Sequence, residues 1–198
     1  MVMNADTNVQ VGSGYMQYDI LQKFTFKQND ALTHKLNFQF SNSGDIPRYD
    51  RLTQLSGANP KFATWNYGPQ KRMMAAYTLE LTKKNKFFDQ GRIILAYQAI
   101  EESRINRKFN TVWENHNLEK LDIFTLNADF AKKMNKHEFR YGAEAYFNKV
   151  NSTAFATNIS VDTSTAISTR YPDGGSSMMS AAVYATHTWE VGDKFIIN

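Results

Sequence analysis

Cysteine is absent from this chain of 198 residues, proline occurs only four times, and no long apolar run is present. Without cysteine there are no disulfide bonds, no thiolate catalysis and no cysteine-ligated metal, and any cellular compartment is compatible. No segment reaches the roughly 18 apolar residues of a membrane-spanning helix. The N-terminal MVMNADTNVQ lacks the basic stretch and apolar run of a secretory signal. The chain is therefore either cytosolic or without its natural beginning.

The sequence has instead a regular alternation of apolar and polar residues. In residues 18–40 an apolar residue stands at almost every second position, and the residues between are mostly polar. Successive side chains of a strand point to opposite faces, so this pattern predicts two-faced strands. The polar segment 28–31 separates two such strands and predicts a hairpin. A helix is excluded because apolar residues two apart would leave it no buried stripe.

The same alternation recurs and predicts about eight strands. A second hairpin is expected at 71–81 and 92–102, a third at 123–132 and 138–148, a seventh strand at 179–189 and a short eighth at the C-terminal FIIN. The expected fold class is all-β, as an antiparallel up-and-down meander.

The connections between these strands alternate in length. Segments 28–31, 82–91, 133–136 and 190–194 are short and polar, whereas 41–70, 103–122 and 149–178 are long. In a meander all short connections lie at one end, and three long loops at the other end are uncommon in soluble domains. Short turns, long loops, and apolar outward faces are typical of an outer-membrane β-barrel. We therefore expect the sheet to be part of a transmembrane β-barrel whose apolar face contacts lipid.

Other classes of protein share some of these features. Alternation alone is more common in soluble sandwiches and lipocalin-like barrels, where the apolar face is the core. A net charge of +4 and a pI of 9.1 are compatible with a nucleic-acid-binding sheet, but no RNP-like run occurs and the basic residues stand opposite the aromatic ones. No nucleophile, phosphate-binding or dinucleotide motif is present, and the four histidines lie apart without metal-ligand spacing. The sequence therefore predicts neither an enzyme nor a nucleic-acid partner, and it points to no cofactor.

Several segments resemble a known family. YDILQKFTFK, LNFQFSNSGDIPRYDRLTQ, WNYGPQKRMMAAYTLEL, FNTVWENHNLEKLDIFTLNADF, YGAEAYFNKV and STRYPDGGSSMMSAAVYATHTW resemble, in this order, the middle of the barrel of TonB-dependent outer-membrane receptors. The resemblance is strongest to receptors of Bacteroidetes for haem or cobalamin-like uptake. It runs from about Ser13 to the end of the chain, and IPRYDRLT and TRYPDGG are its most specific parts.

The resemblance implies a function and a set of partners. Residues 1–14 are a leading segment or loop end, and 15–198 are part of a receptor barrel whose plug domain and remaining strands lie outside this chain. Such a receptor binds a scarce metal chelate, such as haem, a siderophore or cobalamin, for TonB-driven import. Its partners are outer-membrane lipid, the plug, the TonB complex and the ligand, and its location is the outer membrane of a Gram-negative bacterium. The alternative is a complete small eight-stranded barrel, either in the outer membrane or lipocalin-like.

Candidate ligand-binding residues lie in the expected long loops, because loops on a rigid scaffold carry recognition. They are Arg48, Tyr49, Arg51, Trp65, Tyr67, His116, Arg170 and Tyr171. Arg48, Arg170 and His116 are expected to capture an anionic chelate, with the imidazole as a possible axial ligand to haem iron. The competing interpretation is that Arg48 or Arg51 pairs with Asp50 or Asp45 and only holds the loop. No metal site is predicted in the apo chain.

Overall fold

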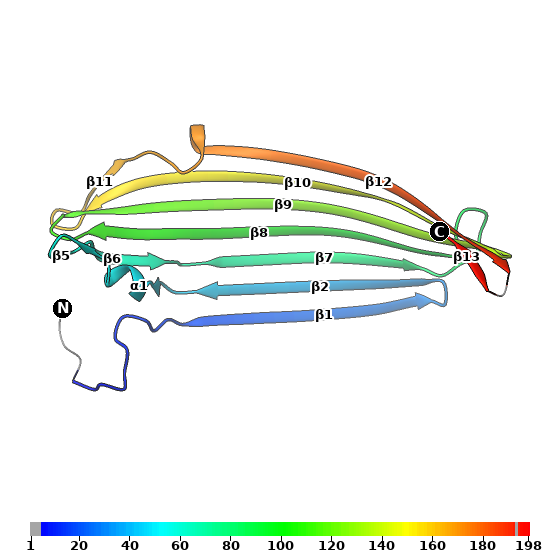
Figure 1. Cartoon of the computed structure of the whole chain (residues 1–198), viewed down its shortest axis with the longest axis horizontal. Helices are drawn as coiled ribbons and strands as arrows, with labels where there is room; N and C mark the ends of the chain where they lie inside the picture. Colours follow the sequence, from blue (N-terminus) through cyan, green and yellow to red (C-terminus); the bar gives the residue numbers. More distant parts are fainter. Residues whose placement is uncertain (1–4, 193) are drawn as a thin grey trace.

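A computed structural model describes residues 5–192 and 194–198, and its main feature is a single long antiparallel sheet (Figure 1). In the order in which they pair, its strands are β1 (Gln17–Asn29), β2 (Leu32–Ser43), β7 (Lys71–Leu81), β8 (Gln90–Lys108), β9 (Trp113–Met134), β10 (His137–Asn158), β12 (Gly175–Gly192) and β13 (Phe195–Ile197). Every pairing is antiparallel and joins neighbours in this meander. The predicted all-β meander of about eight strands, with a short last strand, is confirmed.

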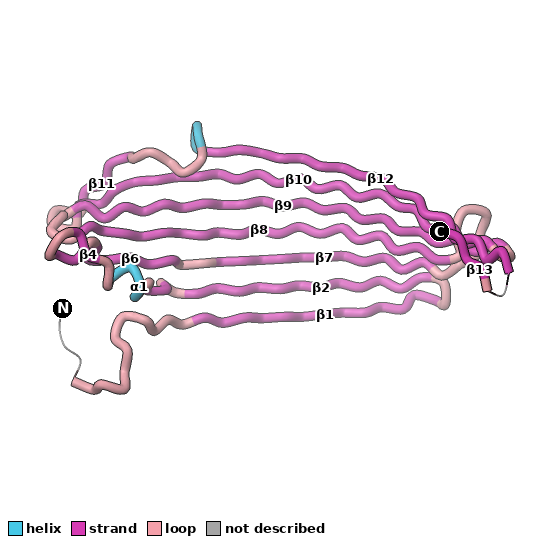
Figure 2. The backbone as a smooth tube through the Cα atoms, in the orientation of Figure 1, coloured by secondary structure: helices cyan, strands magenta, loops and turns pink. Residues whose placement is uncertain are grey.

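Smaller elements gather at one end of the sheet, which we call the loop end (Figure 2). They are β3 (Ile46–Pro47), α1 (Tyr49–Leu52), β4 (Leu55–Ser56), β5 (Asn59–Pro60), β6 (Phe62–Tyr67) and β11 (Thr163–Ala166). The 3₁₀ turn η1 (Pro172–Gly174) lies further along the sheet, where β12 begins. The opposite end carries the tight connections between β1 and β2, β7 and β8, and β9 and β10, and we call it the short-turn end. Residues 5–16 form no helix or strand.

The lengths of two predicted loops were wrong. Residues 103–122 and 149–178 were expected to be long loops, but β8, β9 and β10 continue far into both segments. The connection from β8 to β9 is only residues 109–112. The sequence hid these extensions because apolar and polar residues are mixed on both of their faces, with Val150 and Ala154 on one and Ile105 and Phe155 on the other. The period of two that marks the lower parts of the same strands is therefore lost.

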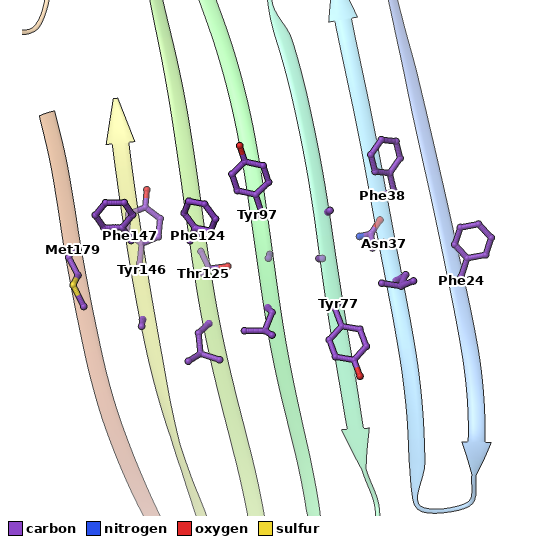
Figure 3. A pocket seen from close by; sticks show the side chains of 17 residues that line it. Phe24, Asn37, Phe38, Tyr77, Tyr97, Phe124, Thr125, Tyr146, Phe147 and Met179 are labelled. Carbon is purple, nitrogen blue, oxygen red and sulfur yellow. The ribbon is translucent and has the colours of Figure 1, made fainter. Parts of the chain in front are cut away.

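The strand register separates two faces. One row of directly paired residues contains Phe24, Leu36, Tyr77, Leu95, Leu126, Ala145 and Ala181, and the next contains Phe38, Ala75, Tyr97, Phe124, Phe147 and Met179. We call this side the apolar face, and Figure 3 shows its rings standing along successive strands. The other side, the polar face, has ion pairs such as Lys35–Glu80 at 2.6 Å and Arg92–Asp129 at 3.7 Å. The predicted alternation is therefore confirmed strand by strand.

The apolar face has no protein layer over it. Ile20, Phe38 and Leu95 are 55%, 40% and 49% exposed, as expected for an outward face. Leu79, Phe130 and Tyr141 on the same face are less exposed, and the Phe130 and Tyr141 rings stack at 5.6 Å. In the part of the chain that the structure describes, the buried apolar residues are only Val150, Ala154 and Ala156. The sheet is thus not folded around a core of its own.

The two edge strands of the sheet, β1 and β13, are not joined to each other as they would be in a closed barrel. Among residues 5–192 and 194–198, β1 pairs with β2 alone and β13 with β12 alone, so no ladder joins the first and last strands. None of the helices within these ranges is long and apolar enough to cross a membrane.

Two glycines let aromatic rings lie flat against the sheet. On the polar face Tyr184 crosses its pair partner Gly142, and its hydroxyl donates to the Asp129 carboxylate at 2.7 Å. A Cβ at Gly142 would come within 2.5 Å of the Tyr184 ring and would also meet the Ala128 carbonyl. On the apolar face Phe130 covers Gly91 in the same way. These rings replace the packing that a glycine in a strand lacks.

Replacing Gly142 by Ala is expected to destabilise the sheet by about 1–3 kcal/mol, the usual cost of an overpacked site. Tyr184→Phe, which keeps the ring and removes the hydroxyl, should cost about 1 kcal/mol. The measurement is urea unfolding in detergent micelles, which keep the apolar face in solution. The control is Gly14→Ala, because a Cβ there meets no atom within 4 Å. Equal stability of Gly142→Ala and the control would contradict the proposed role of the ring.

Candidate functional site

A sharp bend at Gly68 positions the site at the loop end. β7 ends its pairing with β8 at Lys71, and beyond the bend β6 takes the place next to β8, from Tyr67 opposite Arg104 to Phe62 opposite Lys108. Gly68 has a φ of +116°, and a Cβ there would lie 2.6 Å from the Gly44 carbonyl oxygen, so only glycine fits. The buried Ser103 hydroxyl donates to the Gly68 carbonyl and lies 3.2 Å from that of Pro69.

This arrangement places the β6 aromatic rings on the polar face. β8 is continuous from Gln90 to Lys108, so Arg104 has the same parity as Arg92 and points to the same side. Tyr67 stands directly opposite Arg104, and Trp65 stands opposite Asn106. Because paired side chains share a face, Trp65, Tyr67 and Arg104 all extend from the polar face.

Arg48 joins the loop to these rings. Its backbone N–H donates to the Trp65 carbonyl at 2.9 Å. Its Nε and Nη2 donate to the two Asp50 carboxylate oxygens at 2.7 Å each, and its Nη1 donates to the Tyr67 hydroxyl at 2.7 Å. Arg48 immediately precedes α1, so these four bonds fix the helical turn against β6. A bidentate arginine–carboxylate pair is geometrically specific, and lysine cannot reproduce it.

Three guanidinium groups surround the two rings. Trp65 and Tyr67 meet edge to face at 4.9 Å. The Arg48 carbon Cζ lies 5.3 Å from the Trp65 centroid and 5.0 Å from that of Tyr67, Arg51 lies 5.5 Å from Trp65, and Arg104 lies 5.5 Å from Tyr67. We call Arg48, Asp50, Arg51, Trp65, Tyr67 and Arg104 the arginine–aromatic cluster. Three cations and one carboxylate leave it positively charged, which favours an anionic ligand that offers a flat or polarisable surface.

The charges of the central pair are mutually stabilised. The hydrogen bonds from Arg48 lower the pKa of the Asp50 carboxyl below its ordinary value of 3.8. The same bonds raise the pKa of the Arg48 guanidinium further above its already high value. Both groups therefore stay ionised at all physiological pH values, so the net charge of the cluster does not change with pH through either of them.

One further candidate, Arg170, pairs with Glu119 on the polar face next to the cluster. Arg170 Nη1 lies 3.5 Å from Glu119 Oε2, and Glu119 is buried and also accepts a hydrogen bond from the Ser152 hydroxyl at 3.3 Å. On β9, Glu119 stands two residues beyond Asn117, the pair partner of Arg104, so it is a diagonal neighbour of the cluster. Tyr49 and Tyr171 are exposed, and no side-chain contact of theirs is part of this arrangement.

His116 was placed wrongly. It lies in β9 rather than in a loop, with the same parity as Phe124 and Leu126, so it extends from the side of the apolar face. Its ring stacks on Phe155 at 4.9 Å, and its Nε2 lies 3.4 Å from Glu114 Oε1. Trp65 and Tyr67 also lie in a strand rather than a loop, but on the polar face. Arg48, Arg51, Trp65 and Tyr67 are therefore in contact with one another, whereas His116 lies on the opposite face of the sheet.

The expectation that the four histidines lie apart was wrong for two of them. β10 and β12 pair so that His137 Nδ1 lies 3.0 Å from His187 Nε2, although the two are far apart in sequence. Within residues 5–192 and 194–198, no three His, Asp or Glu side chains are grouped as a metal would need. Arg104 was missed because the predicted strand ended at residue 102, whereas β8 continues to Lys108.

Comparisons with known proteins identify a similar fold and no family. No protein-family model matches this chain, and no curated protein matches it. Among solved structures, the copper transporter OprC is similar, with a TM-score of 0.68 over 92% of this chain and 27% of OprC. The chain thus spans about a quarter of the length of that protein. The sequence identity is 8%, so the similarity concerns the fold alone.

Replacing Arg48 by Lys is expected to release the loop while the charge is kept, because lysine cannot donate to both Asp50 oxygens and to Tyr67 together. Cleavage by trypsin after Lys61 should then become severalfold faster than in the unchanged chain. Tyr49→Phe is the matched control in the same helical turn and should leave the rate unchanged. Equal cleavage of all three chains would show that Arg48 does not hold the loop.

The Arg48–Asp50 pair should also give the loop a specific pH dependence. Asp50 has a lower pKa in the folded chain than in the unfolded one, so its stabilising effect is full above about 3.8 and is lost as the pH falls through the lowered value. The protection of the amides of residues 49–53 against hydrogen exchange, relative to the intrinsic exchange rate at each pH, should stay high at neutral pH and fall only in more acidic solution. Asp50→Asn should show the fast exchange already at neutral pH. Slow exchange in that variant would contradict the assignment.

Proposed function

We propose that this chain is part of the wall of an outer-membrane transport receptor of the TonB-dependent type. The observation that carries this proposal is the continuous apolar face, which crosses seven paired strands without any protein layer over it. A soluble protein buries such a face, whereas a transmembrane barrel turns it to lipid.

The height of the apolar face fits a bilayer. Along β2 the face runs from Leu32 to Phe40, a rise of about 27 Å at about 3.4 Å per residue. At a strand tilt of about 40°, this is about 21 Å along the membrane normal, close to the roughly 25 Å apolar band of outer-membrane barrels. Above Phe40 the paired residues on the same face become polar: Asn42, Lys71, Glu101, Lys120 and Asn151. The extended hairpins of β8, β9 and β10 then project beyond the membrane.

The fold similarity to a copper transporter supports a transport role and a larger protein of which this chain forms one part. Under this proposal the polar face, with its ion pairs, lines a lumen that a plug domain fills, and a TonB complex drives opening. Short turns face the periplasm and the loop end faces the outside. The competing small closed barrel needs a ladder between β1 and β13, and the described part of the sheet has none. An origin in Bacteroidetes remains a prediction.

The ligand is proposed to be a small anionic metal chelate held by the arginine–aromatic cluster. Arg51 and Arg104 are its available cations, because Asp50 is already bound by Arg48. The cluster stands where the loop end meets the polar face, which is the route from outside to lumen under this proposal. Haem, siderophores and corrinoids all combine a large polarisable surface with polar or anionic groups, and rings beside guanidinium groups suit such molecules.

Arginine placed on the apolar face is expected to destabilise the inserted chain. Leu126→Arg, near the middle of the face, should lower the free energy of unfolding in lipid vesicles by about 2–4 kcal/mol. Asn127→Arg is the matched control one residue along β9, because it extends from the polar face opposite Glu144. Its effect should be within about 0.5 kcal/mol. Equal costs at the two positions would contradict a lipid-facing apolar surface.

Removing the two available cations is expected to weaken ligand capture. In the receptor that contains this chain, Arg51→Ala with Arg104→Ala should lower the affinity for an anionic chelate about tenfold or more, because charge-assisted bonds contribute about 1.5–3 kcal/mol each. Haemin and ferric citrate are suitable first probes, measured by uptake at limiting concentration and equal surface expression. Lys61→Ala with Lys108→Ala removes the same charge at the same end and should leave uptake unchanged. Unchanged uptake in the arginine variant would restrict the cluster to holding the loop.

A further inference from the structure

The connection between β7 and β8, residues 82–89, is unusual among the short turns. Its sequence TKKNKFFD contains three lysines, Lys83, Lys84 and Lys86, all of them exposed. Phe87 stands beside them with 72% of its surface exposed. An exposed phenylalanine surrounded by lysines combines an apolar tip with a cationic rim.

The turn is attached to the apolar side of the sheet. The Phe88 ring packs on Phe130 at 5.2 Å, and the Tyr141 hydroxyl donates to the Phe87 carbonyl at 2.8 Å. Phe130 and Tyr141 are paired residues of the lowest row of the apolar face. Lys132 Nζ, from the same side of β9, donates to the Asn85 carbonyl at 2.6 Å. The turn therefore continues the apolar face at the short-turn end, where Figure 2 shows it as a separate loop.

The turn is also ordered internally. The Asn85 side-chain oxygen accepts from the backbone N–H groups of Phe87 at 2.8 Å and Phe88 at 3.1 Å. The Asn85 N–H donates to the Phe88 carbonyl at 2.9 Å. These bonds present Phe87 and the lysines in one arrangement, so little conformational entropy is lost when a partner binds.

The positive charge of the turn is not compensated. Its one carboxylate, Asp89, is bound by Lys132 at 2.8 Å and by the Lys133 backbone N–H at 2.9 Å. These bonds lower the pKa of Asp89 below its ordinary value, so the carboxylate is ionised but already neutralised by Lys132. Across the ranges that the structure describes, no carboxylate forms an ion pair with Lys83, Lys84 or Lys86. Three cations are thus available to an external anion.

We infer that residues 82–89 form a binding site for anionic phospholipid headgroups at the membrane surface. Phe87 enters the interface beside the acyl chains, and Lys83, Lys84 and Lys86 contact the phosphates. This arrangement is the one that interfacial anchors use, in which apolar insertion and basic side chains act together. The inference rests on the proposed membrane placement, because only a bilayer around the apolar face brings headgroups to this height.

The test is flotation of the chain with lipid vesicles after dilution from urea. One set of vesicles is phosphatidylcholine, and the other contains about a third phosphatidylglycerol, an anionic lipid. We expect binding to both, because the apolar face inserts, and binding at least about tenfold tighter to the anionic set, since each lysine near an anionic surface contributes about fivefold. Replacing Lys83, Lys84 and Lys86 together by Gln should remove this preference.

The matched control removes three exposed lysines elsewhere: Lys23, Lys61 and Lys108 are replaced by Gln, and the preference should persist. Phe87→Ala should weaken binding to both sets of vesicles. Equal binding of the unchanged chain to both sets, or a preference that survives in the turn variant, would overturn the headgroup site and leave the membrane placement intact. Failure to float with either set would contradict the membrane placement itself.

Discussion

The pairing of every long strand with its neighbours, in one uninterrupted register, determines what the rest of this molecule can do. The ladder satisfies the backbone hydrogen bonds of each strand between two others, and strict alternation then divides the side chains between two faces. One face collects rings and aliphatic chains with no protein over them, and the other collects ion pairs and amides. A sheet of this kind is stable only where its apolar side meets an apolar medium, and under the proposed function that medium is the bilayer.

The same register determines where recognition is possible. β8, β9 and β10 continue past the apolar face without its strict alternation of apolar and polar residues. Their extensions hold the loop end away from the proposed membrane surface. The bend at Gly68 lets β6 pair with the extension of β8. Arg48 then bonds the helical turn α1 to Trp65 and Tyr67 of β6. Trp65, Tyr67 and Arg104 of the arginine–aromatic cluster therefore stand on strands. Arg48, Asp50 and Arg51 come from the loop around α1, and the bonds of Arg48 hold them against β6.

The sequence predicted secondary structure well within the apolar face and poorly beyond it. There, alternation identified the strands, their faces and the short turns, since every second residue must be apolar. Beyond it no such requirement exists, and the extensions of β8 to β10 were mistaken for loops. Arg48 and Asp50 were expected to pair because they are close in sequence. The contacts of Arg104 with Tyr67 and of His137 with His187 depend on register between distant strands, and composition does not reveal them. His116 was assigned to a loop because the extension of β9 was not recognised. Without a strand assignment, the face from which a side chain extends cannot be predicted.

The most direct test of the central claim is the environment of consecutive side chains along one strand in the membrane-inserted protein. Spin labels placed singly at each position from Ile123 to Phe130 of β9 can be challenged with oxygen, which concentrates in lipid, and with a water-soluble nickel chelate. We predict that collision with oxygen peaks at 124, 126, 128 and 130 and that collision with nickel peaks at the positions between them. The same period with the two reagents exchanged, or no period at all, would show that the apolar face does not contact lipid and would contradict this account.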